Sequence, residues 1–101
     1  MENNFYHHFL LLACDLLGNI TVSRTMPVVI ASEVKLKCTA LSNTTAVWWG
    51  IASATWGEVT LTLNPIKLAD QGIYTCFGRR TGSTCTSAKS TNITVKYDVS
   101  E

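Results

Sequence analysis

The sequence predicts an all-β protein, an antiparallel β-sandwich of about seven strands with Greek-key connections. Short segments alternate between apolar and polar residues, and clusters of turn-forming residues separate them. Thr, Ser, Val and Ile recur along the chain, and no stretch after residue 18 has sustained helical spacing. With 101 residues, the chain is long enough for one domain.

The first two predicted strands lie between residues 19 and 40. The stretch NITVSRTMPVVIAS predicts an edge strand broken at Pro27, because proline cannot donate a hydrogen bond to a sheet. In the next stretch, SEVKLKCTA, the side chains of Val34, Leu36 and Cys38 fall on one face and polar side chains on the other. This alternation is typical of a strand with one face on the core and one in water.

A later pair of predicted strands follows the same logic. In VTLTLNPIKLADQG the leucines of the first half point inward, and the strand should end near Asn64 because Pro65 follows. The last predicted strand, TNITVKYDV, places Ile93, Val95 and Tyr97 on its inner face. Turn signals at 42–43, 56–57 and 81–83 separate these segments.

One stretch carries a more specific pattern. In LADQGIYTC, Asp70, Gly72, Tyr74 and Cys76 occupy every second position, and Cys38 lies upstream on an inward face. Two tryptophans, Trp48 and Trp49, stand ten and eleven residues after that first cysteine. The set resembles the immunoglobulin superfamily over residues 19–99, and the short spacing between the cysteines is nearer to its constant-2 and intermediate types.

This resemblance implies a role for each motif residue. It implies a disulfide between Cys38 and Cys76 that joins the two sheets, with a tryptophan packed on it. Tyr74 would return its hydroxyl to the backbone of the corner, where Gly72 permits the turn and Asp70 accepts backbone donors.

The identity of the core tryptophan is open from sequence. The alternation of Val47, Trp49 and Ile51 favours Trp49, whereas the family often has an aromatic residue just after its core tryptophan, which favours Trp48. We favour Trp48, and either choice leaves the other tryptophan facing outward.

Residues 1–18 are expected to be a secretory signal peptide, and residues 19–101 the domain. An apolar centre from Phe9 to Ala13 is too short to span a bilayer, and Gly18 offers a small residue at the cut. One alternative is an irregular N-terminal arm of the domain. Another is a bacterial lipoprotein box, LLAC, that would lipidate Cys14. Three sequons, at Asn19, Asn43 and Asn92, favour the secretory route and glycosylation.

Composition and motifs argue against an enzyme. The net charge is +1 with 15% charged residues, unlike a nucleic-acid or anionic-membrane binder. Both histidines, His7 and His8, lie in the expected leader, and no metal-ligand spacing or phosphate loop is present. No catalytic residue, metal or cofactor is expected.

The sequence instead predicts a secreted binding module for a protein partner at a cell surface. The stretch CFGRRTGSTCTSAK would form a hairpin, and its Phe77, Arg79 and Arg80, with Trp56 and the outward tryptophan, are the expected contacts. The resembled family includes receptors, adhesion proteins and soluble decoys. The chain is also similar in domain size and sequons to immunomodulatory glycoproteins of large DNA viruses.

Cys85 would be an odd thiol if Cys14 were removed with the leader. Three outcomes stay open: a disulfide-linked homodimer, a buried unpaired thiol, or a bridge to a retained Cys14. The first gives an alternative function, a structural or adhesion domain that acts as a Cys85-linked homodimer. The second alternative is a bacterial lipid-anchored binding domain.

Overall fold

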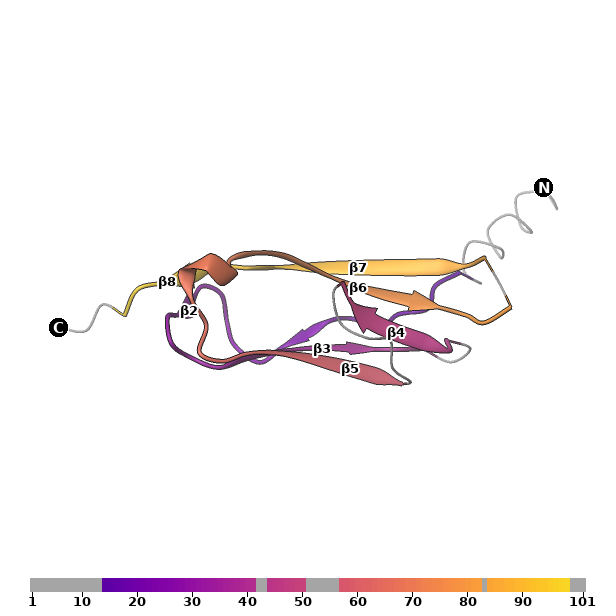
Figure 1. Cartoon of the computed structure of the whole chain (residues 1–101), viewed down its shortest axis with the longest axis horizontal. Helices are drawn as coiled ribbons and strands as arrows, with labels where there is room; N and C mark the ends of the chain where they lie inside the picture. Colours follow the sequence, from indigo (N-terminus) through magenta and orange to yellow (C-terminus); the bar gives the residue numbers. More distant parts are fainter. Residues whose placement is uncertain (1–13, 42–43, 51–56, 83, 99–101) are drawn as a thin grey trace.

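The computed structural model describes residues 14–41, 44–50, 57–82 and 84–98. It is a two-layer β-sandwich, in which β6 and β7 lie over β3 and β5 (Figure 1). The strands are β1 (Thr21–Val22), β2 (Val28–Val29), β3 (Val34–Thr39), β4 (Ala46–Trp49), β5 (Glu58–Leu63), β6 (Gly72–Arg79), β7 (Thr86–Ile93) and β8 (Val95–Lys96), with a 3₁₀ turn η1 (Leu68–Asp70). One layer has the strand order β1-β3-β5, the other β4-β6-β7, and β2 pairs with β8.

The core lies between the two layers, as the alternation of the sequence predicts. Val34, Leu36 and Cys38 of β3 are fully buried, and β3 pairs antiparallel with β5 in a register that sets Leu36 opposite Leu61. From the other layer, Trp49 and Cys76 face them. A disulfide joins Cys38 to Cys76 across the sandwich, the pairing that the family resemblance implies.

The predicted break at Pro27 divides the first edge segment between two sheets. β1 pairs antiparallel with β3, whereas β2, directly after Pro27, pairs parallel with β8. The expectation for Tyr97 is wrong. Its side chain is 63% exposed because β8 ends at Lys96, one residue before the position that would have turned inward.

A hydrogen-bonded corner joins η1 to β6. The Tyr74 hydroxyl donates to the main-chain carbonyl of Asp70, and the Lys67 N–H donates to the Asp70 carboxylate at 2.8 Å. Gly72 has φ = 146°, a backbone conformation that residues with a side chain rarely adopt. Burial, and secondly the nearby Asp70 carboxylate, raise the pKa of the Tyr74 hydroxyl above its ordinary value.

This corner gives a pH prediction. A raised folded-state pKa stabilises the domain below the unfolded tyrosine pKa of about 10, and that contribution is lost as the pH rises through the folded-state value. We expect Tyr74→Phe to cost about 1 kcal/mol at neutral pH through the lost hydrogen bond, and to lose less stability above about pH 10 than the wild type. Urea unfolding of both proteins between neutral pH and pH 11 measures both effects. If wild type and Tyr74→Phe lost the same stability at alkaline pH, the raised pKa of Tyr74 would be contradicted.

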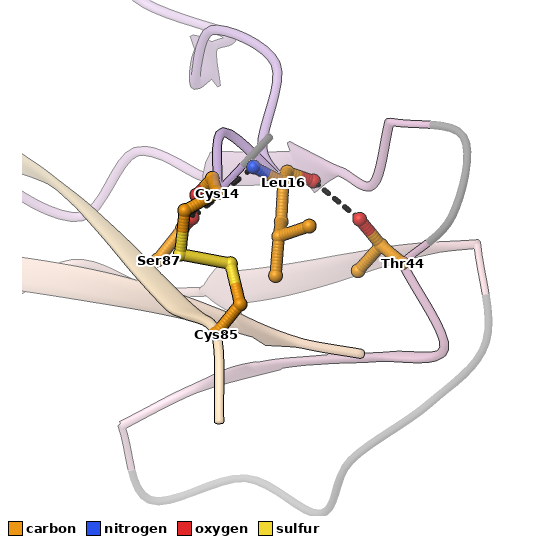
Figure 2. Close-up of a disulfide and its surroundings, with 5 residues drawn as sticks. All are labelled: Cys14, Leu16, Thr44, Cys85 and Ser87. Carbon is orange, nitrogen blue, oxygen red and sulfur yellow. Dashed lines mark hydrogen bonds between the residues drawn. A yellow bond between two sulfur atoms is a disulfide. The ribbon is translucent and has the colours of Figure 1, made fainter. Parts of the chain in front are cut away.

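An N-terminal strap, defined here as residues 14–18, is joined to the sandwich by a disulfide and by hydrogen bonds (Figure 2). Cys14 forms a disulfide with Cys85, and the Leu16 carbonyl accepts hydrogen bonds from the Thr44 hydroxyl at 2.7 Å and the Leu41 N–H at 2.9 Å. The Leu16 N–H donates to the Ser87 hydroxyl at 3.1 Å. The strap is therefore bonded both to the segment before β4 and to β7.

The side chains of the strap are part of the packed interior. Leu16 and Leu17 are buried, and Leu17 forms an antiparallel bridge with Ala40. Leu17 also lies on Gly78, where an added Cβ would come within 2.7 Å of the leucine Cδ2. A glycine at this point of β6 thus makes room for the strap.

These contacts bear on three expectations. Residues 16–18, which precede the expected domain boundary, hydrogen-bond to the domain and pack against it. Cys85 is not an odd thiol, since it is bonded to Cys14. Lipidation of Cys14 would need the sulfur that this bond occupies.

Candidate binding face

The two outer faces of the sandwich differ in chemistry. The outward side chains of β1-β3-β5 are polar or charged, among them Lys35, Lys37, Glu58, Thr60 and Thr62. The outward side chains of β4-β6-β7 include two aromatic rings and an isoleucine instead. The apolar surface of the described strands is thus gathered on one face, which we call the binding face.

An aromatic pair lies at the centre of the binding face. Trp48 of β4 is paired in register with Phe77 of β6, and their ring centroids are 5.6 Å apart with an interplanar angle of 22°. On the other side of Phe77, β7 contributes only Ala88. The two rings are half-buried by each other and stand beside a small neighbour, so their outer surfaces stay accessible.

The positively charged side chain of Arg79 lies next to this aromatic pair. The guanidinium carbon of Arg79, two residues after Phe77 and on the same side of β6, lies 5.7 Å from the Trp48 ring centroid. The Arg79 side chain is exposed. The attraction of a guanidinium to a ring face does not use its five N–H groups as hydrogen-bond donors. The face can therefore offer several donors next to an apolar surface.

Hydroxyl groups surround the cluster and bond to one another. Thr75 and Ser90 share a hydrogen bond of 2.8 Å across β6 and β7, and Thr45 bonds to Thr81 over 2.8 Å. Such cross-strand bonds fix the local geometry of the sheet. They hold the strands that carry the aromatic pair and Arg79 in one register.

The structure brings together three of the residues expected to contact a partner, Trp48, Phe77 and Arg79. Arg80 lies one residue beyond β6, at the start of the turn to β7, and Trp56 falls outside the described residues. The preference for Trp48 as the core residue is wrong. Trp49 is the buried one, and its indole N–H donates to the Val59 carbonyl at 3.2 Å.

The glycosylation sequons have different settings. Asn19 is exposed beside the strap, and Asn43 lies outside the described residues. Asn92 is exposed on β7, directly opposite Ile73, and so belongs to the binding face. Asn92 is four positions along β7 from Ala88, about 13 Å in an extended strand, so a sugar attached there would stand on the same face as the aromatic pair.

One apolar residue of the binding face was not predicted: Ile73 is 73% exposed there, which the inward phase of Tyr74 and Cys76 indicates. The strap lies in the expected leader because its leucines continue an apolar run, but the bridge from Cys85 to a retained Cys14, one of the outcomes left open by the sequence, is confirmed. The even number of cysteines, four, was the available signal that Cys14 has a partner.

The described part of the chain shows neither a metal-ligand cluster nor a membrane-spanning helix. It contains no group of three or more His, Cys, Asp or Glu residues placed to hold a metal ion. None of its helical segments has the length and apolar character needed to cross a membrane.

Solved structures support the fold. No protein-family model matches the chain, and no curated protein matches it either. An immunoglobulin domain from the titin M10–obscurin-like 1 complex is 22% identical with a TM-score of 0.57, over 80% of this chain and 97% of that one. The first immunoglobulin domain of mouse SynCAM 2 is 16% identical with a TM-score of 0.56, over 79% and 97% of the two chains. These similarities establish an immunoglobulin-like β-sandwich.

Proposed function

Because the chain has an immunoglobulin-like fold, we propose that it is an exported binding module that recognises a protein partner at a cell surface, as a receptor-like or decoy domain. The observation that carries this proposal is the cluster of Trp48, Phe77 and Arg79 on one outer face. Tryptophan and arginine are enriched among residues that dominate protein interfaces. The polar outer face of the other sheet has no comparable cluster among its described residues.

The charges of the binding face favour a partner group of a definite kind. Arg79 is the one charged side chain among the described outward residues of β4, β6 and β7. An acidic side chain of the partner, next to an apolar one, would complement it. The carboxylate would accept from the guanidinium edge while the apolar group covers the rings of Trp48 and Phe77.

Matched substitutions test this function. A purified chain is screened against an array of cell-surface ectodomains, and affinity for each binder is then measured by surface plasmon resonance. Arg79→Ala and Trp48→Ala should each weaken binding by about 30-fold, the size of an interface hot spot. Lys37→Ala removes one positive charge from the opposite face and should leave affinity unchanged. Equal affinities for wild type, Arg79→Ala and Trp48→Ala would contradict the proposed face.

The alternative functions have less support. A Cys85-linked homodimer and a lipid anchor on Cys14 each need a sulfur that the Cys14–Cys85 bond uses. Two disulfides within one small domain are typical of proteins that mature in an oxidising compartment. Export would also expose Asn19 and Asn92 to glycosylation, since both side chains are accessible.

A further inference from the structure

Alternate backbone groups of β7 point away from its sheet. β7 is the last strand in the order β4-β6-β7. The Thr75 carbonyl of β6, opposite Ser90 in the register, accepts from the Gly50 N–H on the β4 side. Opposite residues of an antiparallel pair either both face each other or both face away. The N–H and C=O groups of Ser90 therefore point away from β6, and those of Ala88 and Asn92, two positions to either side, do the same.

The residues that follow show how this edge is covered elsewhere. The carbonyls of Thr94 and Lys96 continue the alternation, and each accepts from an N–H of the β2 segment, Val28 or Ile30, at 2.8 Å. Within residues 14–41, 44–50, 57–82 and 84–98, no backbone group bonds to the outward groups of residues 88, 90 and 92. An unpaired strand edge of this kind is a template for a further strand.

A hollow of about 350 Å³ lies along the same edge. It is bordered by β7 and by the segment that leads into β1, and its lining residues are Asn19, Ile20, Lys89, Ser90 and Thr91. A strand added beside β7 would direct alternate side chains toward this hollow. There they would meet the half-buried Ile20 and the positively charged Lys89.

The open stretch is bounded at both ends by this chain. At one end the Ser87 hydroxyl is hydrogen-bonded to the strap, and at the other β2 lies beside Thr94. Residues 88–92 lie between, about 16 Å in an extended strand. A second copy would offer its own β7, which is eight residues long and would bring a second Lys89 to the hollow. A short extended segment of a different protein fits better.

We propose that the edge of β7 from residue 88 to residue 92 binds an extended segment of a partner polypeptide, about five residues long, as an added strand. Its backbone exchanges hydrogen bonds with Ala88, Ser90 and Asn92. Among its side chains that enter the hollow, an apolar one packs on Ile20 and an acidic one pairs with Lys89. This interaction uses backbone groups of β7, so it does not depend on the aromatic pair of the proposed function.

Amide exchange in the free protein tests whether the edge is open. The full chain is produced in the bacterial periplasm, where disulfides form, and hydrogen–deuterium exchange is followed by NMR. The amides of Ala88, Ser90 and Asn92 should exchange at least about tenfold faster than those of Lys89 and Thr91, which face β6. Equal protection of Ser90 and Lys89 would overturn the proposal, because the edge would then be covered.

A synthetic peptide tests the partner. The probe is a capped peptide in which threonine alternates with valine, glutamate and valine, and its addition should slow exchange at Ala88, Ser90 and Asn92. N-methylation of one alternate set of its nitrogens should abolish binding, and methylation of the other set should not. Ser90→Pro removes an outward N–H, a change that an edge strand tolerates, and should weaken binding about tenfold. Ser90→Ala keeps that N–H and should bind as the wild type.

The charge of the hollow is tested by exchange of partners. Lys89→Glu should weaken binding of the glutamate peptide, and a peptide with lysine in place of glutamate should restore it. Trp48→Ala should leave peptide binding unchanged, so a failure of the proposed function and a failure of this proposal are distinguishable. Exchange rates that the peptide leaves unchanged at millimolar concentration would overturn the proposal. So would binding that is insensitive both to Ser90→Pro and to N-methylation of either set.

Discussion

A chain that begins at Asn19 should be less stable than one that begins at Cys14 by on the order of 5 kcal/mol. The bond between Cys14 and Cys85 spans 71 residues and contributes about 4 kcal/mol in the chain-entropy model. Burial of Leu16 and Leu17 adds about 1.5–3 kcal/mol for each side chain. Ordering the strap offsets part of this gain, at about 1–2 kcal/mol per residue, while its hydrogen bonds restore some of it.

Such a loss is large for a domain of this size. Small domains are typically stable by about 5–15 kcal/mol, so the shortened chain should unfold at much lower urea or fail to accumulate. Equilibrium urea unfolding, followed by tryptophan fluorescence, measures the difference in midpoint.

Two further chains separate the bridge from the leucines. Cys14→Ser with Cys85→Ser, in the chain that begins at Cys14, removes the disulfide and keeps Leu16 and Leu17 in place. Cys85→Ser in the chain that begins at Asn19 removes both and avoids a stray thiol. If these two chains unfolded at the same urea concentration, burial of the strap leucines would contribute nothing and the assigned packing would be contradicted.

The two adjacent tryptophans should respond very differently to truncation. Trp49→Ala empties a core position that is 1% exposed and removes the donor to the Val59 carbonyl, so we expect a loss of about 3–5 kcal/mol. Trp48→Ala removes an outward ring stacked on Phe77, and a cross-strand aromatic pair contributes about 0.5–1.5 kcal/mol.

Partner affinity should depend on the two tryptophans in the opposite order to stability, with Trp48 the more important. Trp48→Ala is expected to stay folded and to lose partner affinity. Trp49→Phe keeps much of the core volume and should bind as the wild type wherever it is folded. Urea unfolding and surface plasmon resonance on the same preparations provide both measurements. Comparable stability losses for Trp48→Ala and Trp49→Ala would show that the phase of β4 has been misassigned.

Much of the fold follows from residue alternation. The phases of β3 and β5 are visible in the sequence because each strand has one face in the core and one in water. For β4 the alternation of Val47, Trp49 and Ile51 indicates the correct phase, but it does not decide between two adjacent tryptophans, because tryptophan is apolar enough for a core and amphipathic enough for a surface. The outward position of Trp48 becomes clear only from its register with Phe77.

The candidate face was predicted in part. Phe77 and Arg79 were expected contacts because they stand in an unusual hairpin sequence, but their meeting with Trp48 depends on pairing between strands far apart in the chain. The strap could not be located from local pattern, since a leader and a buried edge segment are both apolar. Only the long-range partners of Cys14 and Leu16 distinguish the two.

The nesting of the two disulfides has a mechanical consequence. The loop from Cys14 to Cys85 encloses the loop from Cys38 to Cys76. Tension applied to the two ends of the chain is therefore carried by the Cys14–Cys85 bond and not by the backbone between these two residues. On the C-terminal side, tension can extend the chain after Cys85, and residues 86–101 span about 55 Å when fully extended. A force probe would therefore detach β8 and then β7. The chain between Cys14 and Cys85 would not extend further, because the disulfide between these two residues carries the load.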